Sequence, residues 1–223
     1  MPDGLARRWL MALLFLGLSS GTAAAQVRSG TGFFITPDGT ILTSAHVVKD
    51  CREIAVFPPL GGRVVASLRV SSASLDIALL TLPDVGVRYV VPNGIREPAI
   101  GTPVRTVAYG VKRDAPEQPI RLAGTVIGRD DARPPLLVID VQVEQGTSGA
   151  PMLDATDALA GVVIGRYTDT PEKGVMVSAA AVRSFLATHG IRLPPPREPE
   201  LPQVSQSEIL RNTTLLVQCV PRR

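Results

Sequence analysis

The sequence predicts an all-β protein of the sandwich or barrel class. Short runs rich in Val, Ile and Leu recur along most of the chain, and turns that contain Gly or Pro separate them. Residues 179–188 are the one segment with the alanine-rich composition of a clear helix. A stretch with several Pro and Gly residues, ending near Gly101, divides the strands into two halves of similar size.

The first half begins with a predicted hairpin. Strand-like residues 32–35 and 40–42 flank the sequence TPDG, whose residue types favour a tight turn. The strands that follow in this half are predicted at residues 54–57, 63–70 and 77–82.

The second half repeats this pattern and ends in a helix and a tail. Its strands are predicted at residues 104–109, 120–127, 136–143, 158–164 and 174–177, before the helix at 179–188. After the helix, the proline-rich residues 193–202 indicate an extended, stiff linker. A last apolar run, residues 214–220, predicts one more strand.

The N-terminus has the pattern of an export signal. Arg7 and Arg8 precede a short apolar core, and small residues ending at Ala25 follow it. The core is shorter than the ~20 residues that span a bilayer, which disfavours the alternative of a membrane anchor. We therefore expect a signal peptide over residues 1–25, a periplasmic or secreted protein, and no membrane span after the signal is removed.

Composition argues against nucleic acid and metal ligands. The 23 Lys and Arg residues nearly balance 20 Asp and Glu residues, and no basic cluster is present to follow a phosphate backbone. The two cysteines form no C-x-x-C pattern, and neither histidine has zinc-site spacing. We infer no nucleic-acid partner, no metal and no cofactor, while the oligomeric state stays open.

One stretch carries a candidate nucleophile. Ser148 lies between two glycines in the sequence QGTSGAP, directly after the apolar run at residues 136–143. Glycines permit a tight, irregular turn there, so the hydroxyl would be exposed at the end of a rigid element. A serine hydroxyl is a poor nucleophile without an adjacent base.

Two histidines could supply that base. His46 follows a strand-like run, and Asp76 stands just before an apolar strand, where an unpaired carboxylate would be costly to bury. His46, Asp76 and Ser148 are therefore candidates for a catalytic triad. The alternative base is His189, in the Ser, Asp, His order of α/β-hydrolases. Their nucleophile turn is G-x-S-x-G, however, whereas Ala150 occupies the fifth position here.

Three blocks around these residues resemble a known family. Residues 30–48, 76–80 and 146–151 look like the histidine, aspartate and serine blocks of trypsin-like serine proteases, with the closest resemblance to the HtrA/Deg branch. The resemblance implies a chymotrypsin-like fold of two packed antiparallel β-barrels, with a short C-terminal helix and an extended C-terminal tail.

The resemblance also implies how the chain is divided. Residues 26–100 would form the first barrel, with His46 and Asp76, and residues 101–190 the second, with Ser148. Residues 191–223 would be the linker and the tail strand. The stretch after Gly190 is too short for the PDZ domain that HtrA proteases usually carry, so we expect none.

The function implied is that of a serine endopeptidase acting on proteins or peptides. Ser148 would attack the peptide carbonyl, His46 would transfer the proton, and Asp76 would orient the imidazole. The backbone N–H groups of Gly146 and Ser148 would bind the oxyanion. The rival from another class is a catalytically weak or inactive protease-like binding or chaperone module.

The substrate pocket is expected on both sides of the nucleophile turn. Its base would come from the region of Gln142 and Glu144, and one wall from Gly165 and Arg166. No aspartate at the base directs a preference for Lys or Arg, and the family resemblance favours small or medium apolar side chains.

Two positions in the serine block depart from related sequences. Ala150 stands where glycine is usual, so it would be strained if this position needs positive φ, and otherwise its methyl group would crowd the neighbouring barrel. Thr147 stands where many zymogens have the aspartate that pairs with a new N-terminal amine. Threonine cannot form that ion pair.

The two cysteines lie far apart in the sequence. Cys51 follows the histidine block, and Cys219 lies in the apolar tail, which the extended linker allows to reach back across the molecule. We expect the tail to dock on the first barrel as an edge strand and Cys51 and Cys219 to form a disulfide. The alternative is a disordered tail with two free thiols.

We predict that the mature chain begins near Gln26 and needs no further N-terminal cut, because Thr147 cannot pair with a new amine. N-terminal sequencing of the exported protein checks the cleavage site. Extra residues placed ahead of Gln26 should leave proteolysis intact. An extension that abolishes proteolysis until it is removed would contradict the prediction.

Overall fold

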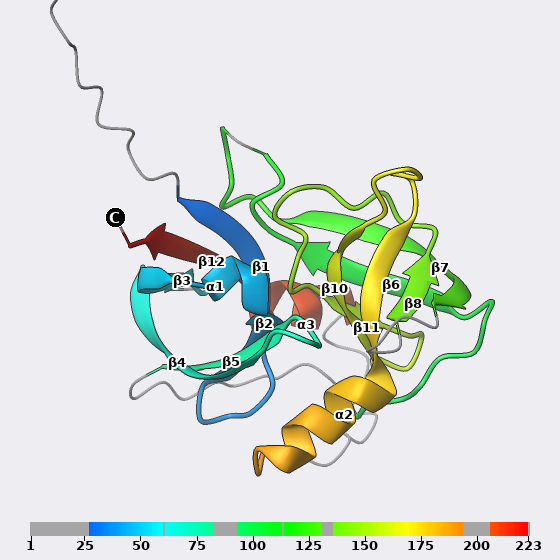
Figure 1. Cartoon of the computed structure of the whole chain (residues 1–223), viewed down its shortest axis with the longest axis horizontal. Coiled ribbons are helices and arrows are strands. Elements are labelled where there is room, and N and C mark those ends of the chain that lie inside the picture. The colour runs from blue at the N-terminus through cyan, green and yellow to red at the C-terminus, as the bar shows by residue number, and fades with distance from the viewer. Residues whose placement is uncertain are drawn as a thin grey trace, which may run out of the picture.

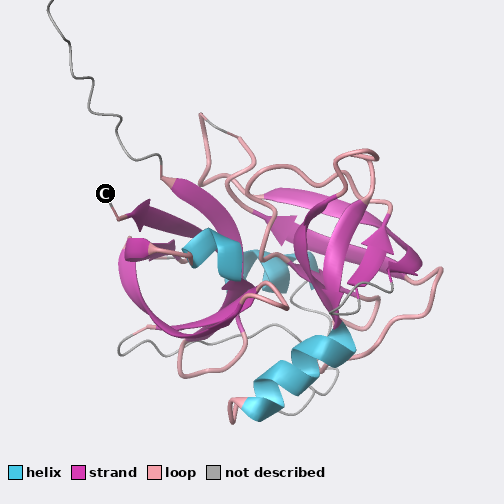
Figure 2. Cartoon of the chain, in the orientation of Figure 1, coloured by secondary structure: helices cyan, strands magenta, loops and turns pink. Residues whose placement is uncertain are grey.

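The chain forms two closed, six-stranded barrels that stand side by side (Figure 1). Every strand pairing within them is antiparallel, and strands outnumber helices throughout (Figure 2). The prediction of an all-β fold with two packed barrels is confirmed. The computed structural model describes residues 27–59, 61–82, 93–112, 114–130, 136–193 and 206–222, so the expected signal peptide and most of the linker lie outside it.

The first barrel has the strand order β1-β12-β3-β4-β5-β2. A short helix, α1 (Ala45–Val48), follows β2 directly. The strands are β1 (Arg28–Phe34), β2 (Thr40–Ser44), β3 (Cys51–Phe57), β4 (Val64–Ser72), β5 (Ile77–Thr81) and β12 (Thr214–Pro221).

The turn between β1 and β2 follows the expected chemistry. The carboxylate of Asp38 accepts hydrogen bonds from the hydroxyls of Thr36 and Thr40. These bonds, that from Thr36 above all, lower the pKa of Asp38 below its ordinary value. Gly39 has φ of 87°, a conformation that glycine adopts without strain.

The second barrel has the strand order β10-β11-β8-β7-β6-β9. The helix α2 (Ala179–Thr188) follows β11, as predicted, whereas β9 is too short to be recognised from its pattern. The strands are β6 (Pro103–Ala108), β7 (Ile120–Asp130), β8 (Leu136–Ile139), β9 (Pro151–Leu153), β10 (Leu159–Arg166) and β11 (Gly174–Ser178).

Alternate residues of one strand serve two different cores. Phe34 in β1 packs inside the first barrel with Leu80 and Val217, while its neighbour Phe33 faces the cluster that joins both barrels. This follows from the two-residue period of a strand. Buried members of the joining cluster include Phe33, Leu42, Leu79, Leu159, Val162, Val177 and Leu216. The barrels therefore share apolar contacts as well as having cores of their own.

The C-terminal tail completes the first barrel. A short helix, α3 (Gln206–Thr213), leads into β12, which pairs with β1 on one side and β3 on the other. The expectation of an edge strand is therefore wrong. Leu215 and Val217 of β12 are fully buried, so removing this strand would expose the core and leave two unpaired strand edges.

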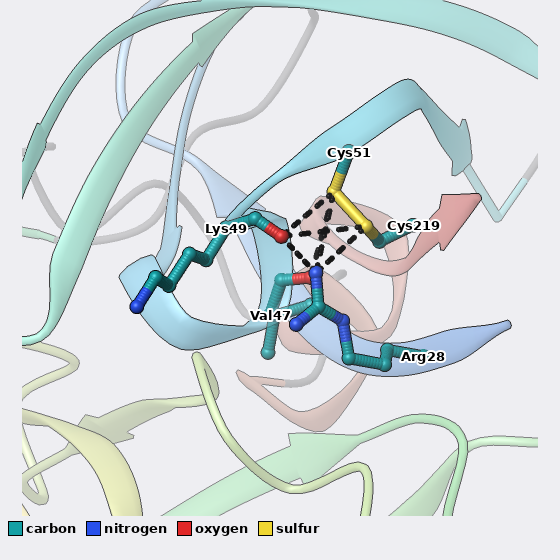
Figure 3. Close-up of a disulfide and its surroundings, with 5 residues drawn as sticks. All are labelled: Arg28, Val47, Lys49, Cys51 and Cys219. Atoms are coloured by element: carbon teal, nitrogen blue, oxygen red, sulfur yellow. Dashed lines mark hydrogen bonds between the residues drawn. A yellow bond between two sulfur atoms is a disulfide. The ribbon is translucent and has the colours of Figure 1, made fainter. Parts of the chain in front are cut away.

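A disulfide fastens this strand to β3. Cys51 and Cys219 are bonded, with their Cα atoms 5.4 Å apart, as the sequence analysis expected. The guanidinium of Arg28 lies over the bond, with a nitrogen 3.2 Å from Sγ of Cys219, and donates to the carbonyl oxygen of Lys49 (Figure 3). In the described residues, no helix is long and apolar enough to cross a membrane.

We predict that replacing both cysteines, in the variant Cys51→Ser/Cys219→Ser, lowers the free energy of unfolding. The bridge spans a sequence separation of 168 residues, for which the chain-entropy model gives up to about 5 kcal/mol. Urea denaturation of the variant and of oxidised wild type measures the difference. Equal midpoints and slopes for the two proteins would contradict the prediction.

Candidate active site

His46 and Asp76 come from neighbouring strand ends of the first barrel. β2 pairs with β5 up to the register Ser44↔Ile77, so the residues after Ser44 and before Ile77 leave the barrel at the same point. There the N–H of Ala45 donates to the carbonyl oxygen of Asp76 at 3.0 Å. Antiparallel pairing therefore brings His46 beside Asp76, although 30 positions separate them in the chain.

The carboxylate of Asp76 makes two contacts with His46. Its Oδ2 lies 2.6 Å from Nδ1 of the ring, and its Oδ1 accepts the backbone N–H of His46 at 2.8 Å. Because an ionised carboxylate only accepts hydrogen bonds, Nδ1 carries a proton, and in the neutral ring Nε2 keeps its lone pair. The His46 side chain is 49% exposed, so a substrate can reach this ring.

Asp76 has a left-handed backbone, with φ of 54°. Aspartate tolerates this conformation better than most residues, and here the surrounding hydrogen bonds hold it in place. Such strain is typical of functional positions, where the fold fixes a conformation that the isolated chain would avoid.

Ser148 lies in a turn that needs glycine at two positions. Gly146 and Gly149 have φ of 104° and 90°. A Cβ on Gly149 would lie 2.0 Å from the carbonyl oxygen of Thr31, and one on Gly146 would lie 2.4 Å from the carbonyl carbon of Gly110. The serine turn therefore touches backbone directly on both sides.

The second barrel holds this turn against β10. Gly149 donates its N–H to the carbonyl oxygen of Val163 at 2.7 Å, and Val163 donates to that of Ala150 at 3.0 Å. The hydroxyl of Ser148 donates to the carbonyl oxygen of Ile164 at 3.4 Å. Ser148 is thus fixed at the end of a rigid element, as expected.

The first barrel meets the turn on its other side. The N–H of Thr31 donates to the carbonyl oxygen of Ser148 at 2.8 Å. A Cβ on Gly30 would lie 2.6 Å from the side chain of Val47 and 3.1 Å from that same carbonyl oxygen. Val47 and Ser148 thus flank Gly30, which places the helix that carries His46 beside the serine turn. In the described part of the chain, no hydrogen bond joins Ser148 to His46.

Two backbone N–H groups of the turn are unused. Within the described residues, neither Gly146 nor Ser148 donates its amide hydrogen to another group. By contrast, Thr147 between them donates to the carbonyl oxygen of Glu144 at 3.1 Å. These two amides, on either side of Thr147, are therefore left as available hydrogen-bond donors in the turn that carries Ser148.

The expected pocket residues lie near the start of β11. Gly174 pairs with Arg166 of β10 and with Ile139 at the end of β8, so the residues after β8 and at the end of β10 lie around it. Gln142, Glu144 and Arg166 are exposed, and a Cβ on Gly165 would meet no atom within 4 Å. Beside Arg166, the hydroxyl of Tyr167 donates to Asp130, which raises the pKa of Tyr167 to about 12.

A hollow that the sequence did not predict lies beside His46. It has a volume of about 440 Å³. Its lining comes from α1, the residues after it and the β4–β5 region, and includes Ala45, His46, Val48, Lys49, Leu68, Ser71, Ala73 and Asp76. Separation in sequence hides this hollow, because β4 is brought near His46 by its pairing with β5, which in turn pairs with β2.

His189 is far less suited to act as a base. It follows α2, where its ring packs on Phe185 with centroids 4.5 Å apart and its Nδ1 lies 2.8 Å from the carbonyl oxygen of the same residue. No carboxylate contacts its ring in the described residues. These contacts pack the His189 ring against the C-terminal end of α2.

Ala150 fits its position without strain. It is absent from the residues with positive φ, and its side chain is fully buried in the core of the second barrel. The structure therefore shows neither a positive φ at this position nor crowding of the first barrel, because the methyl group packs within the core of the second barrel.

The three sequence blocks thus meet at one place, and comparison with known proteins identifies their family. A family model described as a trypsin-like peptidase domain matches residues 30–162. The chain belongs to the trypsin-like peptidase family. That match spans all three blocks, which the structure brings together where the two barrels meet.

Individual relatives give the same result. The serine protease Rv3671c of Mycobacterium tuberculosis is 34% identical over 179 residues, which cover 76% of this chain and 44% of the relative. Human serine protease HTRA4 is 27% identical over 185 residues, covering 77% and 37%. The crystal structure of the Rv3671c protease in its active form matches with a TM-score of 0.64 at 25% identity, covering 77% of this chain and 78% of that chain.

These relatives make the trypsin-like chain a homologue of the HtrA/Deg serine proteases, as its blocks indicated. The chain spans less than half the length of the two curated relatives.

We predict that Gly149→Ala lowers the free energy of unfolding by about 3 kcal/mol or more, because a Cβ there meets backbone at an unfavourable φ. Gly165→Ala is the matched control, since its Cβ would meet open space. It should change stability by no more than about 0.5 kcal/mol. Thermal and urea unfolding compare them, and equal losses in the two variants would contradict the prediction.

Proposed function

We propose that this trypsin-like protein is an exported serine endopeptidase that hydrolyses peptide bonds through Ser148, His46 and Asp76. One observation carries the proposal. The His46–Asp76 pair of the first barrel lies beside a rigid serine turn of the second, and that turn has two unused amide donors.

The chemistry follows from these positions. Oγ of Ser148 forms a bond to the carbonyl carbon of the peptide, and its proton passes to Nε2 of His46. The resulting imidazolium is stabilised by Asp76, which accepts its Nδ1–H. The imidazolium then protonates the leaving amine, the C–N bond breaks, and an acyl-enzyme remains. Water, deprotonated by His46, releases the acid and restores Ser148.

The amides of Gly146 and Ser148 support both steps. The carbonyl oxygen of the substrate becomes an anion in each tetrahedral intermediate, and hydrogen bonds to it strengthen as the charge develops. Loss of one such donor typically costs about 3 to 4 kcal/mol in the transition state. The donors need no reorganisation, since the turn already leaves them without internal partners.

An extended peptide can bind along the free edge of β10. β9 pairs with β10 as far as Val162, and Val163 bonds to the serine turn. Beyond this point, Gly165 and Arg166 pair on one side with β11 after a bulge at Ile164, while no described strand pairs on the other side. A substrate that adds here as a strand would pass directly in front of Ser148.

The substrate side chains would enter two regions. The space beside Gly165, near Gln142, Glu144 and Arg166, would receive the residue before the scissile bond, with a preference for small or medium apolar groups. The hollow beside His46, which Leu68 and other residues line, would receive a neighbouring residue.

Export is supported by the disulfide and by the N-terminal sequence. The Cys51–Cys219 disulfide is typical of an oxidising compartment. Residues 1–25 have the composition of a secretory signal, although they lie outside the described residues.

One observation favours the alternative of an inactive binding module. The hydroxyl of Ser148 donates to Ile164 and not to His46. Rotation about its Cα–Cβ bond is a fast rotamer change, however, and catalytic hydrogen bonds are often formed only with substrate present. A fluorophosphonate probe separates the two functions, because it labels Ser148 only where the serine is activated.

We predict that Ser148→Ala and His46→Ala each lower proteolysis of a denatured protein by about four to six orders of magnitude, because each removes a group that takes part in bond formation. Mass spectrometry of the probe-treated wild type should find the label on Ser148.

His189→Ala is the control for this experiment, because within the described residues the ring and hydrogen-bond contacts of its imidazole are with Phe185 at the helix end. It should retain proteolysis within a few-fold of wild type. Equal loss of activity from His189→Ala, in a protein whose circular dichroism is unchanged, would refute the assigned triad.

A further inference from the structure

Thr31 in β1 contacts the serine turn through both its side chain and its backbone. Its side chain is fully buried, and it stands between Gly30 and Gly32. A Cβ on Gly30 would lie 3.1 Å from the carbonyl oxygen of Ser148, so glycine permits the close approach. No sequence pattern singled out Thr31, since a threonine between glycines is ordinary in a strand.

The hydroxyl of Thr31 bridges two segments of the second barrel. It accepts the N–H of Tyr109 at 2.8 Å, and its oxygen lies 2.7 Å from the carbonyl oxygen of Gly146 and 3.4 Å from that of Tyr109. A hydroxyl has one hydrogen, so it donates to the nearer oxygen, that of Gly146. The backbone N–H of Thr31 donates to the carbonyl oxygen of Ser148 at 2.8 Å.

These contacts hold two peptide planes at both ends. In the plane between Gly146 and Thr147, the C=O accepts from Thr31 and the N–H donates to Glu144. In the plane between Ser148 and Gly149, the C=O accepts from Thr31 and the N–H donates to a carbonyl of β10. Because peptide groups are planar, each plane is fixed as a unit.

The unused amide donors lie next to these fixed planes. The N–H of Ser148 belongs to the plane between the two, and the N–H of Gly146 belongs to the plane just before them. Gly146 has φ of 104° and no side chain, so its neighbouring peptide can rotate easily unless it is held. The Thr31 hydroxyl is the side-chain group that holds it from the first barrel.

We propose that Thr31 is a positioning residue, whose hydroxyl fixes the serine turn in the conformation that directs the amides of Gly146 and Ser148 at the substrate oxyanion. The proposal rests on the proposed protease function. It gives the first barrel a part in transition-state stabilisation, in addition to supplying His46 and Asp76.

Thr31→Val tests the hydroxyl, because valine keeps the shape of threonine and removes both hydrogen bonds. We expect kcat on a peptide substrate to fall about ten- to a hundredfold, while KM changes by less than about threefold, since the oxyanion forms only in the transition state. Thr31→Ser is a separate variant that keeps a hydroxyl at this position, and its kcat should stay within a few-fold of wild type.

Thr106→Val is the matched control for lost stability. Thr106 is also buried and its hydroxyl donates to a backbone carbonyl, that of Val107, but among the described residues it makes no hydrogen bond to the serine turn. It should lower the thermal midpoint and leave kcat unchanged. Thr31→Ala removes the hydroxyl without placing a methyl group near the Gly146 carbonyl, and it supplies the comparison if the valine variant does not fold.

The outcomes separate this proposal from the proposed function. A wild type that neither hydrolyses peptides nor reacts with a fluorophosphonate would overturn the protease function itself. With an active wild type, an unchanged kcat in Thr31→Val would overturn the positioning role. An equal loss of kcat in Thr31→Ser would also overturn it. So would failure of both Thr31→Val and Thr31→Ala to fold, because the hydroxyl would then be required for folding itself.

Discussion

The site depends on one close approach of backbone to backbone between the barrels. Each barrel closes around its own core, and neither alone contains all three residues of the proposed triad. His46 and Asp76 leave the first barrel at the ends of β2 and β5, while Ser148 lies between β8 and β9 in the second. The distance between them is set where β1 meets the serine turn. At Gly149 there is no room for even a methyl group against the carbonyl oxygen of Thr31. Contacts between backbones cannot be relaxed by a change of rotamer, so the relative position of the two halves is rigid at this point.

The same strand is supported from its other edge by the end of the chain. Six residues of β1 pair with β12, including Thr31 with Leu216. A tail that is remote in sequence therefore forms part of the framework behind the site. Pairing between segments so far apart carries a large loop-closure entropy. The Cys51–Cys219 disulfide offsets part of it by restricting the unfolded chain, and Arg28 covers the bond at the same end of the barrel.

The electrostatic arrangement divides between the two halves in the same way. The first barrel contributes a carboxylate that accepts the two N–H groups of His46, and the second contributes amides that have no acceptor among the described residues. Under the proposed function, positive charge would develop on the first barrel at the imidazole and negative charge on the second at the oxyanion. The groups that would stabilise each charge under this proposal are held by the fold itself, and preorganised groups of this kind are the usual basis of electrostatic catalysis. Membership of the trypsin-like peptidase family agrees with this arrangement.

The sequence by itself determined the family, the all-β class, most strands and the helix at α2. It could do so because these features rest on local patterns, namely alternating apolar residues, the TPDG turn, and glycines around Ser148. The turn chemistry at Asp38 was equally readable. The backbone conformation of Ala150 could not be predicted, since its φ depends on how the serine turn packs within the second barrel. The short strand β9 and the helix α3 were missed, because three residues carry no period and the eight residues of α3 include only two apolar ones, Ile209 and Leu210.

The tertiary structure alone decided the place of the tail, the hollow beside His46 and the part played by Thr31. The apolar run at 214–220 predicted a strand, but whether it would lie at an edge or inside a closed barrel depended on the unpaired sides of β1 and β3. Thr31 had no sequence signal, because its partners are backbone groups of Tyr109, Gly146 and Ser148. Every residue offers the same backbone groups, so which of them meet is fixed only when the two barrels pack together.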